Sequence, residues 1–452
     1  MVSELRACGL VVARYVETQF VWAQAATAWC TRSNPIDNRF AEGYRPGEGC
    51  LVSIRYMGTK RHMVGTVREA ISALQPRGRV VDLFSGMGSV AESLAPDGLS
   101  VVTNDALAFT ASLSRAKFKG ATRQRTAASV AQDLFECYWE LRTIARQSNK
   151  AQLEAEASAL SNGREALTSY MAEVRHVGNS GQVRERAQQA AEATDADHYV
   201  LATLYFSAGY MSLEQAIDID ALRGAIDADG RSEDRDWLLG AWIAAISVVL
   251  NAPGHTAQHL RPNSDAAYKR MARVWRRGIW GEFCDALERL KQVGTDEWRA
   301  DNDVLVSDAL DLVAKRELCD VGVVYADPPY TKDQYSRFYH LYETLYRYDF
   351  PDSNGVGRVR SDRFSTGFSL KSQVRASFHD LCRNVALMRT PLIISYPSNG
   401  LLQQTNVDVE EIASKYFSRV DVSSVTARHS TMGASSGKSK KEATENLYVC
   451  NW

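Results

Sequence analysis

One acid, two prolines and one aromatic residue, Asp327-Pro328-Pro329-Tyr330, directly follow an apolar run. Two successive prolines remove two backbone donors and stiffen the chain, so the carbonyl groups of this turn act as fixed acceptors. An aryl amine is a poor nucleophile because its lone pair is delocalised into the ring. A carboxylate and a carbonyl that accept its N–H groups would free this lone pair for attack on an activated methyl group. Tyr330 could stack on a base that has left its helix. The turn therefore predicts methyl transfer to the exocyclic amine of a base, N6 of adenine or, as the second choice, N4 of cytosine; a rigid loop without chemistry is the alternative.

A glycine-rich turn earlier in the chain predicts the partner of this chemistry. The turn, Ser85-Gly86-Met87-Gly88-Ser89, lies between the apolar run that begins at Arg79 and a helical stretch. Such a turn lets the backbone approach a ligand closely and presents N–H groups to it. Asp105 ends the next apolar run, where a carboxylate can accept hydrogen bonds from ribose hydroxyls. Ala91 replaces the third glycine of the dinucleotide fingerprint, and an acid, Asp82, precedes the turn. The pattern favours an adenosyl ligand without a pyrophosphate over NAD; a tight turn without a ligand is the alternative.

The apolar runs predict an α/β fold with a parallel sheet. Strand, helix and strand alternate from Arg79 to Asp105, and apolar runs resume after residue 300. The intervening stretch has the long helical periods of 131–146 and 152–176, interrupted by Gly163 and by residues 178–181. We therefore predict a Rossmann-like sheet with a largely helical insertion. The predicted strands are 79–84, 99–104, 304–306, 321–326, 391–396 and 447–449. The predicted parts are an N-terminal extension (1–50), a first catalytic part (51–122), the insertion (123–300) and a second catalytic part (301–452).

Composition excludes several classes of protein. The chain has 452 residues, 45% of them apolar and 24% charged, which is typical of a globular protein of two or three lobes. No apolar run approaches the roughly 20 residues that span a bilayer, and charged residues interrupt the N-terminal apolar stretch. We therefore expect a cytoplasmic protein without a membrane partner. The eight cysteines include no C-x-x-C pair. This argues against a metal site and against a disulfide framework.

The net charge of −1 does not indicate a nucleic-acid partner, so local charge is more informative. Two basic runs are candidates for DNA phosphate contacts. The first is interleaved with Tyr268, Trp275 and Trp280 and is equally compatible with an amphipathic helix whose aromatic residues are buried. The second lies in a loop rich in glycine, serine and lysine. The candidate residues are Lys269, Arg270, Arg273, Arg276, Arg277, Lys438, Lys440 and Lys441. His255 and His259 could read bases, but a core role is favoured.

The order of these motifs resembles the DNA adenine N6-methyltransferase family, specifically the α-group, whose recognition domain interrupts the catalytic sheet. The stretch from Arg55 to Lys60 is similar to the N-terminal cofactor motif of that family, although Met57 and Thr59 stand where relatives often have small residues. The segment Gln334–His340 is also similar to the family. It follows the Asp327-Pro328-Pro329-Tyr330 turn, which is called the catalytic turn below. The matches cover residues 53–450 except for about 125–195.

The resemblance implies S-adenosylmethionine as the cofactor and double-stranded DNA as the substrate. It assigns Asp308 to the adenine side of the cofactor and gives Asp327 two roles, toward the cofactor and toward the target amine. Together with the glycine-rich turn, the candidate cofactor-binding residues are Tyr56, Lys60, Asp82, Phe84, Ser85, Gly86, Gly88, Ser89, Asp105, Asp308 and Asp327. Enzymes of this kind most often serve restriction–modification or phage defence, so a cognate restriction or defence subunit is a further expected partner.

Three alternatives stay open. The same chemistry serves N4 of cytosine, or adenine in RNA. The first residue of the catalytic turn is Asp rather than Ser, which favours adenine. The third alternative is a DNA-binding subunit without catalysis. The intact carboxylates and Tyr330 argue against it, because such a subunit has no need of an acid at position 327.

Overall fold

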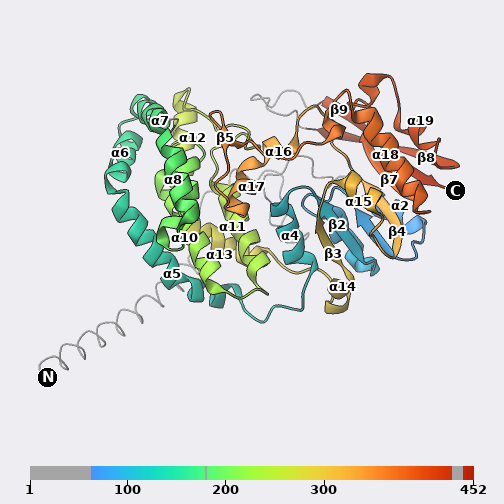
Figure 1. Cartoon of the computed structure of the whole chain (residues 1–452), viewed down its shortest axis with the longest axis horizontal. Coiled ribbons are helices and arrows are strands. Elements are labelled where there is room, and N and C mark those ends of the chain that lie inside the picture. Colours follow the sequence, from blue (N-terminus) through green and yellow to red (C-terminus); the bar gives the residue numbers. More distant parts are fainter. Residues whose placement is uncertain (1–62, 179–180, 430–440) are drawn as a thin grey trace, which may run out of the picture.

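The computed structural model, which describes residues 63–178, 181–429 and 441–452, contains a seven-stranded sheet, on the right in Figure 1. The strand order is β3-β2-β1-β4-β7-β9-β8. The strands from β3 to β7 in this order pair in parallel, and β9 is antiparallel to both of its neighbours. Their bounds are β1 (Arg79–Asp82), β2 (Val101–Asp105), β3 (Asp303–Val306), β4 (Val321–Ala326), β7 (Leu392–Pro397), β8 (Arg419–His429) and β9 (Lys441–Asn451). The predicted mixed α/β fold with a mostly parallel sheet is therefore confirmed.

The strands that the sequence predicted are apolar runs. Strands β1, β2, β3, β4 and β7 confirm five of them; β2 and β7 are almost entirely buried, whereas β3 lies at the sheet edge and Val306 is 48% exposed. The last predicted strand is longer than 447–449 and forms β9. Strand β8 was not predicted: it lies at the sheet edge and alternates polar and apolar residues, and Val422 is 43% exposed. A short hairpin of β5 (Ser353–Asn354) and β6 (Val359–Arg360) lies outside the sheet.

The chain reverses its direction of travel across the sheet between β1 and β4. From β1 the chain proceeds through β2 to the edge strand β3, and from β4 it proceeds the other way to β7. Strands β1 and β4 are paired, with Asp82 opposite Tyr325. Ligands of open parallel sheets bind outside the carboxyl ends of the strands at such a switch point. The glycine-rich turn follows β1 and Asp327 follows β4, so the topology brings the two predicted motifs together.

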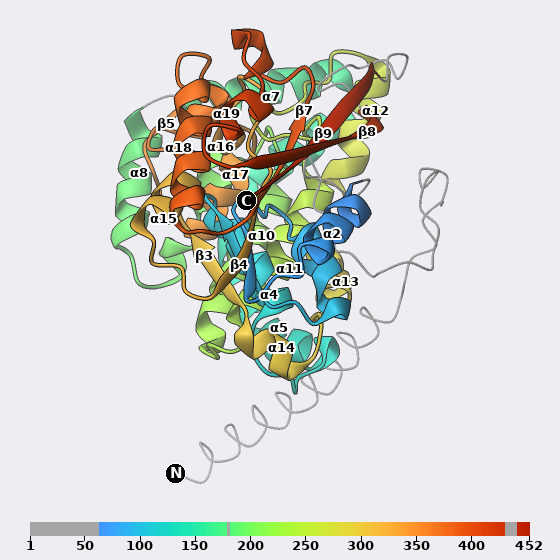
Figure 2. The ribbon, with the colours of Figure 1, turned by 90° about the vertical axis from the view of Figure 1, so that its right-hand side faces the viewer.

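Alternate residues of the central strands serve two different cores. Val80, Val323 and Ile393 pack with one cluster, which also contains residues of α2 (Val64–Ala73) and α3 (Ser89–Leu94). Their neighbours Val81 and Val324 pack with residues of α15 (Ala309–Lys315), α18 (Val374–Leu387) and α19 (Val409–Ala413). Side chains alternate across a strand with a period of two, so each helical layer covers one face. In Figure 2, α15 and α18 lie to the left of the strands and α2 to the right.

A helical part lies between β2 and β3 in the sequence and beside the sheet in space (Figure 1). Its core contains no residue of the seven-stranded sheet. The predicted helical period 152–176 is divided at Gly163, as that glycine indicated. The helices are α4 (Ala108–Phe118), α5 (Ala127–Ser148), α6 (Lys150–Ser161), α7 (Arg164–Gly178), α8 (Gly181–Glu192), α9 (Leu201–Tyr205), α10 (Leu213–Asp229), α11 (Arg235–Val249), α12 (Asp265–Trp275), α13 (Ile279–Arg289) and α14 (Asp296–Asp301).

Two segments connect the helical part to the sheet. Helix α4 follows β2 directly and contributes Phe109 and Leu113 to the helical core. From the other side, Phe338 and residues of α17 (His340–Arg347) enter the same core, although they follow the catalytic turn in sequence. The predicted domain boundaries at 123, 300 and 301 remain a prediction. Residues on both sides of these boundaries contribute to the helical core. In the part of the chain that the structure describes, no helix is long and apolar enough to cross a membrane.

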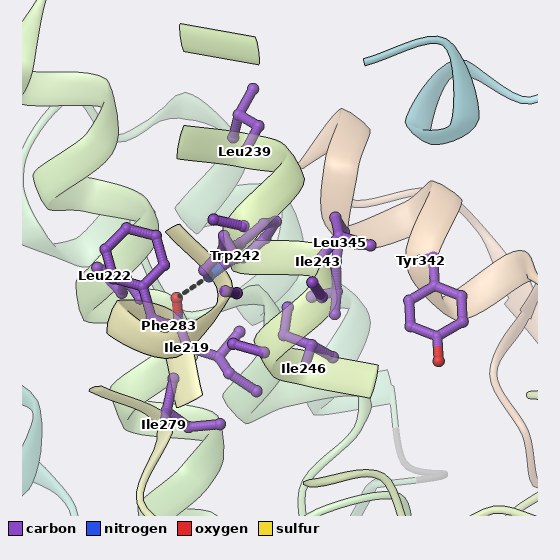
Figure 3. Packing of buried hydrophobic residues seen from close by; sticks show 14 of the residues in the cluster. Ile219, Leu222, Leu239, Trp242, Ile243, Ile246, Ile279, Phe283, Tyr342 and Leu345 are labelled. Carbon is purple, nitrogen blue, oxygen red and sulfur yellow. Dashed lines mark hydrogen bonds between the residues drawn. The ribbon is translucent and has the colours of Figure 1, made fainter. Parts of the chain in front are cut away.

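Trp242 lies at the centre of the helical core. It is fully buried, and its Nε1 donates a hydrogen bond to the Ile219 carbonyl at 3.1 Å (Figure 3). We expect Trp242→Ala to lower the free energy of unfolding by about 3–5 kcal/mol, because it leaves a cavity and removes this hydrogen bond. Urea unfolding measures the loss. Ile144→Ala is the control: Ile144 is 43% exposed, so a change within about 0.5 kcal/mol is expected. Equal losses in both variants would contradict this description of the core.

Candidate active site

A pocket opens at the carboxyl ends of β1, β2, β3 and β4. Its walls contain the glycine-rich turn, the Asp327-Pro328-Pro329-Tyr330 turn and two further segments. Of the predicted site residues, those that line the pocket are Asp82, Phe84, Ser85, Gly86, Ser89, Asp105, Asp308, Asp327, Pro328, Pro329 and Tyr330. Gly88 lies in the same turn. The structure therefore brings together residues that are up to 248 positions apart in the sequence, from Asp82 to Tyr330.

The glycine-rich turn is fixed to the neighbouring strand by backbone hydrogen bonds. The Gly86 N–H donates to Asp105 Oδ2 at 3.0 Å, and the Ser85 N–H donates to the Asn104 carbonyl at 2.9 Å. Gly86 and Gly88 have φ values of 50° and 73°, which L side chains rarely adopt. A Cβ on Gly88 would lie 2.5 Å from the Phe118 ring. Glycine at position 88 is therefore required both by the backbone conformation and by the packing of the turn.

Asp105 and Asp308 accept hydrogen bonds from the backbone. Asp105 Oδ1 accepts from the Leu107 N–H at 2.9 Å, so both of its oxygens have partners. Burial raises the pKa of Asp105 to about 6, against these hydrogen bonds, which lower it. Asp308 caps α15: its Oδ1 accepts from the N–H groups of Leu310 and Asp311 at 2.8 and 3.1 Å. Both carboxylates are thus held in fixed positions on the pocket wall.

Asp82 is held differently, because its side chain is 2% exposed and its Oδ1 has no hydrogen-bond partner among the described residues. Burial raises the pKa of Asp82 to about 8, and the nearby charges of Asp327 and Asp105 raise it further, while a hydrogen bond from the Phe84 backbone lowers it. An orphaned buried carboxyl oxygen is costly unless it is protonated or meets a ligand. Asp82 is therefore the group of this pocket that most requires a cation or a proton.

The catalytic turn is tied to the sheet at its far end. The Tyr330 carbonyl accepts a hydrogen bond from the Leu401 N–H at 2.9 Å, and Tyr330 packs at the margin of the sheet core. Asp327 is half-buried and Pro328 is buried. Burial raises the pKa of Asp82 and of Tyr330, and the charge of Asp327 raises both further, so the Asp327 carboxylate lies near both groups. The carboxylate of Asp327 therefore shares one cavity with the glycine-rich turn.

The sequence did not predict the opposite wall, which two segments form together. Gln334, Tyr335 and Ser336 come from the first segment, and Phe364, Thr366 and Phe368 from the second. The Gln334 side-chain amide donates to the Thr366 carbonyl at 3.1 Å and accepts from the Thr366 N–H at 3.0 Å. The Phe368 ring meets the Phe84 ring edge to face at 5.5 Å. The sequence indicates the first segment only through its resemblance to the family, and the second segment contains no motif that could indicate it.

The charges of the pocket are all of one sign. Its described lining contains four carboxyl groups, those of Asp82, Asp105, Asp308 and Asp327, and no lysine, arginine or histidine. The described residues contain no group of histidine, cysteine, aspartate and glutamate arranged to hold a metal ion. Such a pocket suits an organic cation and repels a pyrophosphate. S-adenosylmethionine carries a sulfonium and an ammonium group, so the residues present fit this cofactor. Tyr56 and Lys60 lie outside the described residues.

The candidate DNA-binding residues lie on or directly after α12, at the start of β9, or outside the described residues. Lys269, Arg270 and Arg273 are exposed on α12, and Arg276 and Arg277 follow it. The aromatic residues among them belong to cores: Trp275 and Trp280 are 3% and 5% exposed. None of the five cations lines the pocket described above. Lys438 and Lys440 lie outside the described residues, and Lys441 begins β9.

His255 and His259 have the core roles that the sequence favoured. The His255 ring stacks on Phe338, with centroids 4.9 Å apart, and burial lowers its pKa. His259 is 7% exposed and packs edge to face against Tyr210. The next residue after His255, Thr256, donates through its N–H and its Oγ1 to the Phe338 carbonyl at 2.6 and 2.7 Å. This loop therefore holds the segment that leads away from the catalytic turn.

A family model matches the part of the chain that contains the Asp327-Pro328-Pro329-Tyr330 turn. The family model of D12 class N6 adenine-specific DNA methyltransferases matches residues 286–390. The predicted resemblance to the DNA adenine N6-methyltransferase family is confirmed. The match contains β3, Asp308, β4 and the catalytic turn, which are the parts of this family's enzymes that the resemblance implied. The mostly parallel sheet with many helices is consistent with a methyltransferase fold.

Curated relatives are type II modification methylases. The chain is 23% identical over 358 residues to modification methylase LlaI of Lactococcus lactis subsp. lactis, covering 77% of this chain and 47% of that protein. It is 23% identical to type II methyltransferase M.FokI of Planomicrobium okeanokoites, covering 78% of this chain and 46% of that protein. Modification methylase StsI of Streptococcus sanguinis is 22% identical over 206 residues, 44% of this chain and 28% of that protein. The chain thus spans about half the length of the first two relatives.

Gly88→Ala tests the packing of the glycine-rich turn. We expect a loss of about 1–3 kcal/mol in the free energy of unfolding and weaker binding of S-adenosylhomocysteine, because the new Cβ must displace the Phe118 ring and strain the backbone. Urea unfolding and isothermal titration calorimetry measure the two effects. Gly98→Ala is the matched control, since Gly98 has a φ of 67° but no atom within 4 Å of the added Cβ. If both variants bind the ligand equally well, the turn does not depend on this contact.

Proposed function

We propose that the protein is a site-specific DNA methyltransferase that transfers a methyl group from S-adenosylmethionine to N6 of a flipped-out adenine. The observation that carries the proposal is the single cavity in which four carboxyl groups, the glycine-rich turn and the Asp327-Pro328-Pro329-Tyr330 turn meet without a basic side chain among the described lining residues. The family match and the modification methylases among the relatives support the same activity.

The proposed cofactor site uses the walls formed by β1, β2 and β3. Asp82 and Asp105 face the cavity from adjacent strands, and Asp308 faces it from the start of α15. We assign the ammonium and sulfonium charges to Asp82 and Asp327 and the ribose and adenine sides to Asp105 and Asp308. When bound, the cofactor supplies an electrophilic methyl group. The acidic walls stabilise its positive charge, and the buried position of Asp82 excludes water from that contact.

The target amine belongs at the catalytic turn. The Asp327 carboxylate accepts one N–H group of the amine, and a carbonyl of the proline-stiffened backbone accepts the other. These acceptors favour a tetrahedral nitrogen with its lone pair directed at the methyl group. Tyr330, half-buried at the pocket wall, offers a ring on which the purine stacks. The positive charge that develops on the nitrogen is stabilised by Asp327, which can also direct its proton toward solvent.

The helical insertion, predicted as 123–300, is proposed as the target-recognition domain, with double-stranded DNA as the partner. Its own core and its contacts with the segment after the catalytic turn support this role. A restriction–modification system with a cognate nuclease or defence subunit is the proposed setting, by analogy with the modification methylases.

Replacement of Asp327 tests the catalytic assignment. We expect Asp327→Ala and Asp327→Asn to lower the rate of DNA methylation at least about 10²-fold, by analogy with the loss of one preorganised transition-state partner. Tritium transfer from labelled S-adenosylmethionine to duplex DNA measures the rate. Asp380→Asn on α18 is the control, because Asp380 does not line the pocket and pairs with Arg383. Unchanged methylation in both Asp327 variants would remove the catalytic role.

The methylated base distinguishes the proposal from its alternatives. Mass analysis of nucleosides after incubation with duplex DNA and with RNA is expected to show N6-methyladenine in DNA alone. N4-methylcytosine, or methylation of RNA, would replace the substrate assignment but keep the chemistry. No methylated nucleoside in any arm, with cofactor still bound, would favour a subunit without catalysis.

The charge of Asp82 predicts a pH dependence of cofactor binding. Because the pKa of Asp82 is raised to about 8, the group is protonated in the free protein below that pH. A cationic ligand favours the ionised form, so binding at pH 7 should release a proton, and affinity should rise as pH approaches 8. Calorimetry in buffers of different ionisation enthalpy counts the protons. The amine of the ligand titrates near pH 8 as well, so the difference between the wild-type protein and Asp82→Asn isolates the contribution of Asp82. Equal proton release in both proteins would contradict the assignment.

A further inference from the structure

A group of cations lies on the same two segments that form the opposite wall of the pocket. Residues 331–337 and 361–371 carry Lys332, Arg337, Arg363 and Lys371, against two acids, Asp333 and Asp362. Lys332 and Arg337 are exposed, and Arg363 is half-buried. Within the described ranges, no ion pair forms with any of the four cations. Lining residues alternate with them, since Ser336 precedes Arg337 and Phe364 follows Arg363.

Hydrogen bonds hold the two segments together at this point. Ser336 Oγ donates to the Phe364 carbonyl, and Arg363 Nη1 donates to Ser336 Oγ at 3.5 Å. Deeper in the wall, Ser369 Oγ donates to the Asp333 carbonyl at 3.2 Å. The guanidinium group of Arg363 is therefore placed directly beside a residue that lines the pocket.

The nearby acids are occupied by a different arginine. The buried Arg360 pairs with Asp349 at 2.7 Å and with Asp362 at 2.8 Å, and Arg347 lies 3.9 Å from both acids. These contacts fix the backbone just before Arg363 and leave its charge uncompensated.

Arg337 and Arg363 belong to one electrostatic neighbourhood. Burial lowers the pKa of His340 to about 4, and the charges of Arg337 and Arg363, together with that of Arg360, add to this effect. Arg337 also lies near His255, which stacks on Phe338 and is close to Asp333. Arg337 and Arg363 therefore both lie near the buried His340 ring.

We propose that Arg337 and Arg363 bind the backbone phosphates that flank the target nucleotide, and so hold its sugar and phosphate at the entrance while the base enters the pocket. This inference rests on the proposed function. The four carboxyl groups inside repel a polyanion, so a nucleotide can be held only where cations surround the entrance. Arg337 and Arg363 each adjoin a lining residue in the sequence, Ser336 and Phe364, whereas no residue of α12 adjoins one.

The salt dependence of DNA binding tests the proposal. Fluorescence anisotropy with a short labelled duplex that the wild-type protein methylates, in the presence of S-adenosylhomocysteine, gives Kd over a range of salt concentrations. We expect Arg337→Ala and Arg363→Ala each to weaken binding several-fold and to reduce the slope of log Kd against log salt by about 0.9. Arg337→Lys and Arg363→Lys should retain most of the slope, because a lysine still neutralises a phosphate. A residue that read guanine through its bidentate geometry would not be replaced by lysine in this way.

Arg375→Ala is the matched control, because Arg375 is exposed on α18, forms no ion pair with the described residues and does not line the pocket. An unchanged slope in both alanine variants, or an equal reduction in Arg375→Ala, would overturn the proposal. Because Arg337 is exposed, Arg337→Ala carries the test even if Arg363→Ala does not fold. Failure of the proposed function is a separate result: the wild-type protein itself would then methylate no duplex.

Discussion

The site depends on one electrostatic constraint: carboxyl groups gather in a cavity whose described walls contain no cation. Two of them, Asp105 and Asp308, are partly satisfied by backbone N–H groups, which also fix the glycine-rich turn and the start of α15. Asp82 Oδ1 accepts no hydrogen bond from the described residues, and Asp82 is the least exposed of the four acids. The fold can maintain this arrangement only if a proton or a cationic ligand occupies the cavity, which is the property that a sulfonium cofactor requires.

The sheet creates this constraint through its topology. Strands β1 and β4 are adjacent, and the chain leaves them in opposite directions, so the turns after both strands meet without a connection between them. The opposite wall has another origin. It consists of two irregular segments joined by the paired hydrogen bonds of Gln334 and Thr366, and the loop at Thr256 secures it to the helical part. The sheet therefore positions the two turns, and the loop at Thr256 in the helical part supports the opposite wall.

Charge is separated over a short distance at this site. The interior is acidic, whereas Arg337 and Arg363 at the entrance are not paired with acids in the part of the chain that the structure describes. A cationic small molecule and a polyanionic polymer can thus approach the same cavity without competing for the same groups. Arg360 makes this possible, because it neutralises Asp349 and Asp362 and keeps them from pairing with Arg363.

The sequence by itself determined the local elements that carry the chemistry. Strands β1, β2, β3, β4 and β7 are apolar runs, and the two motifs depend on glycines and prolines that act through their own backbone. The sequence could not determine the edge strand β8, whose pattern is mostly polar, or the wall formed by Phe364, Thr366 and Phe368, which has no local signature. Three properties depend on contacts between residues that are distant in the sequence. They are the raised pKa of Asp82, the absence of an ion pair at Arg363 among the described residues, and the packing of α17 in the helical core. Only the tertiary structure decides these properties, because burial and charge proximity are properties of neighbours in space.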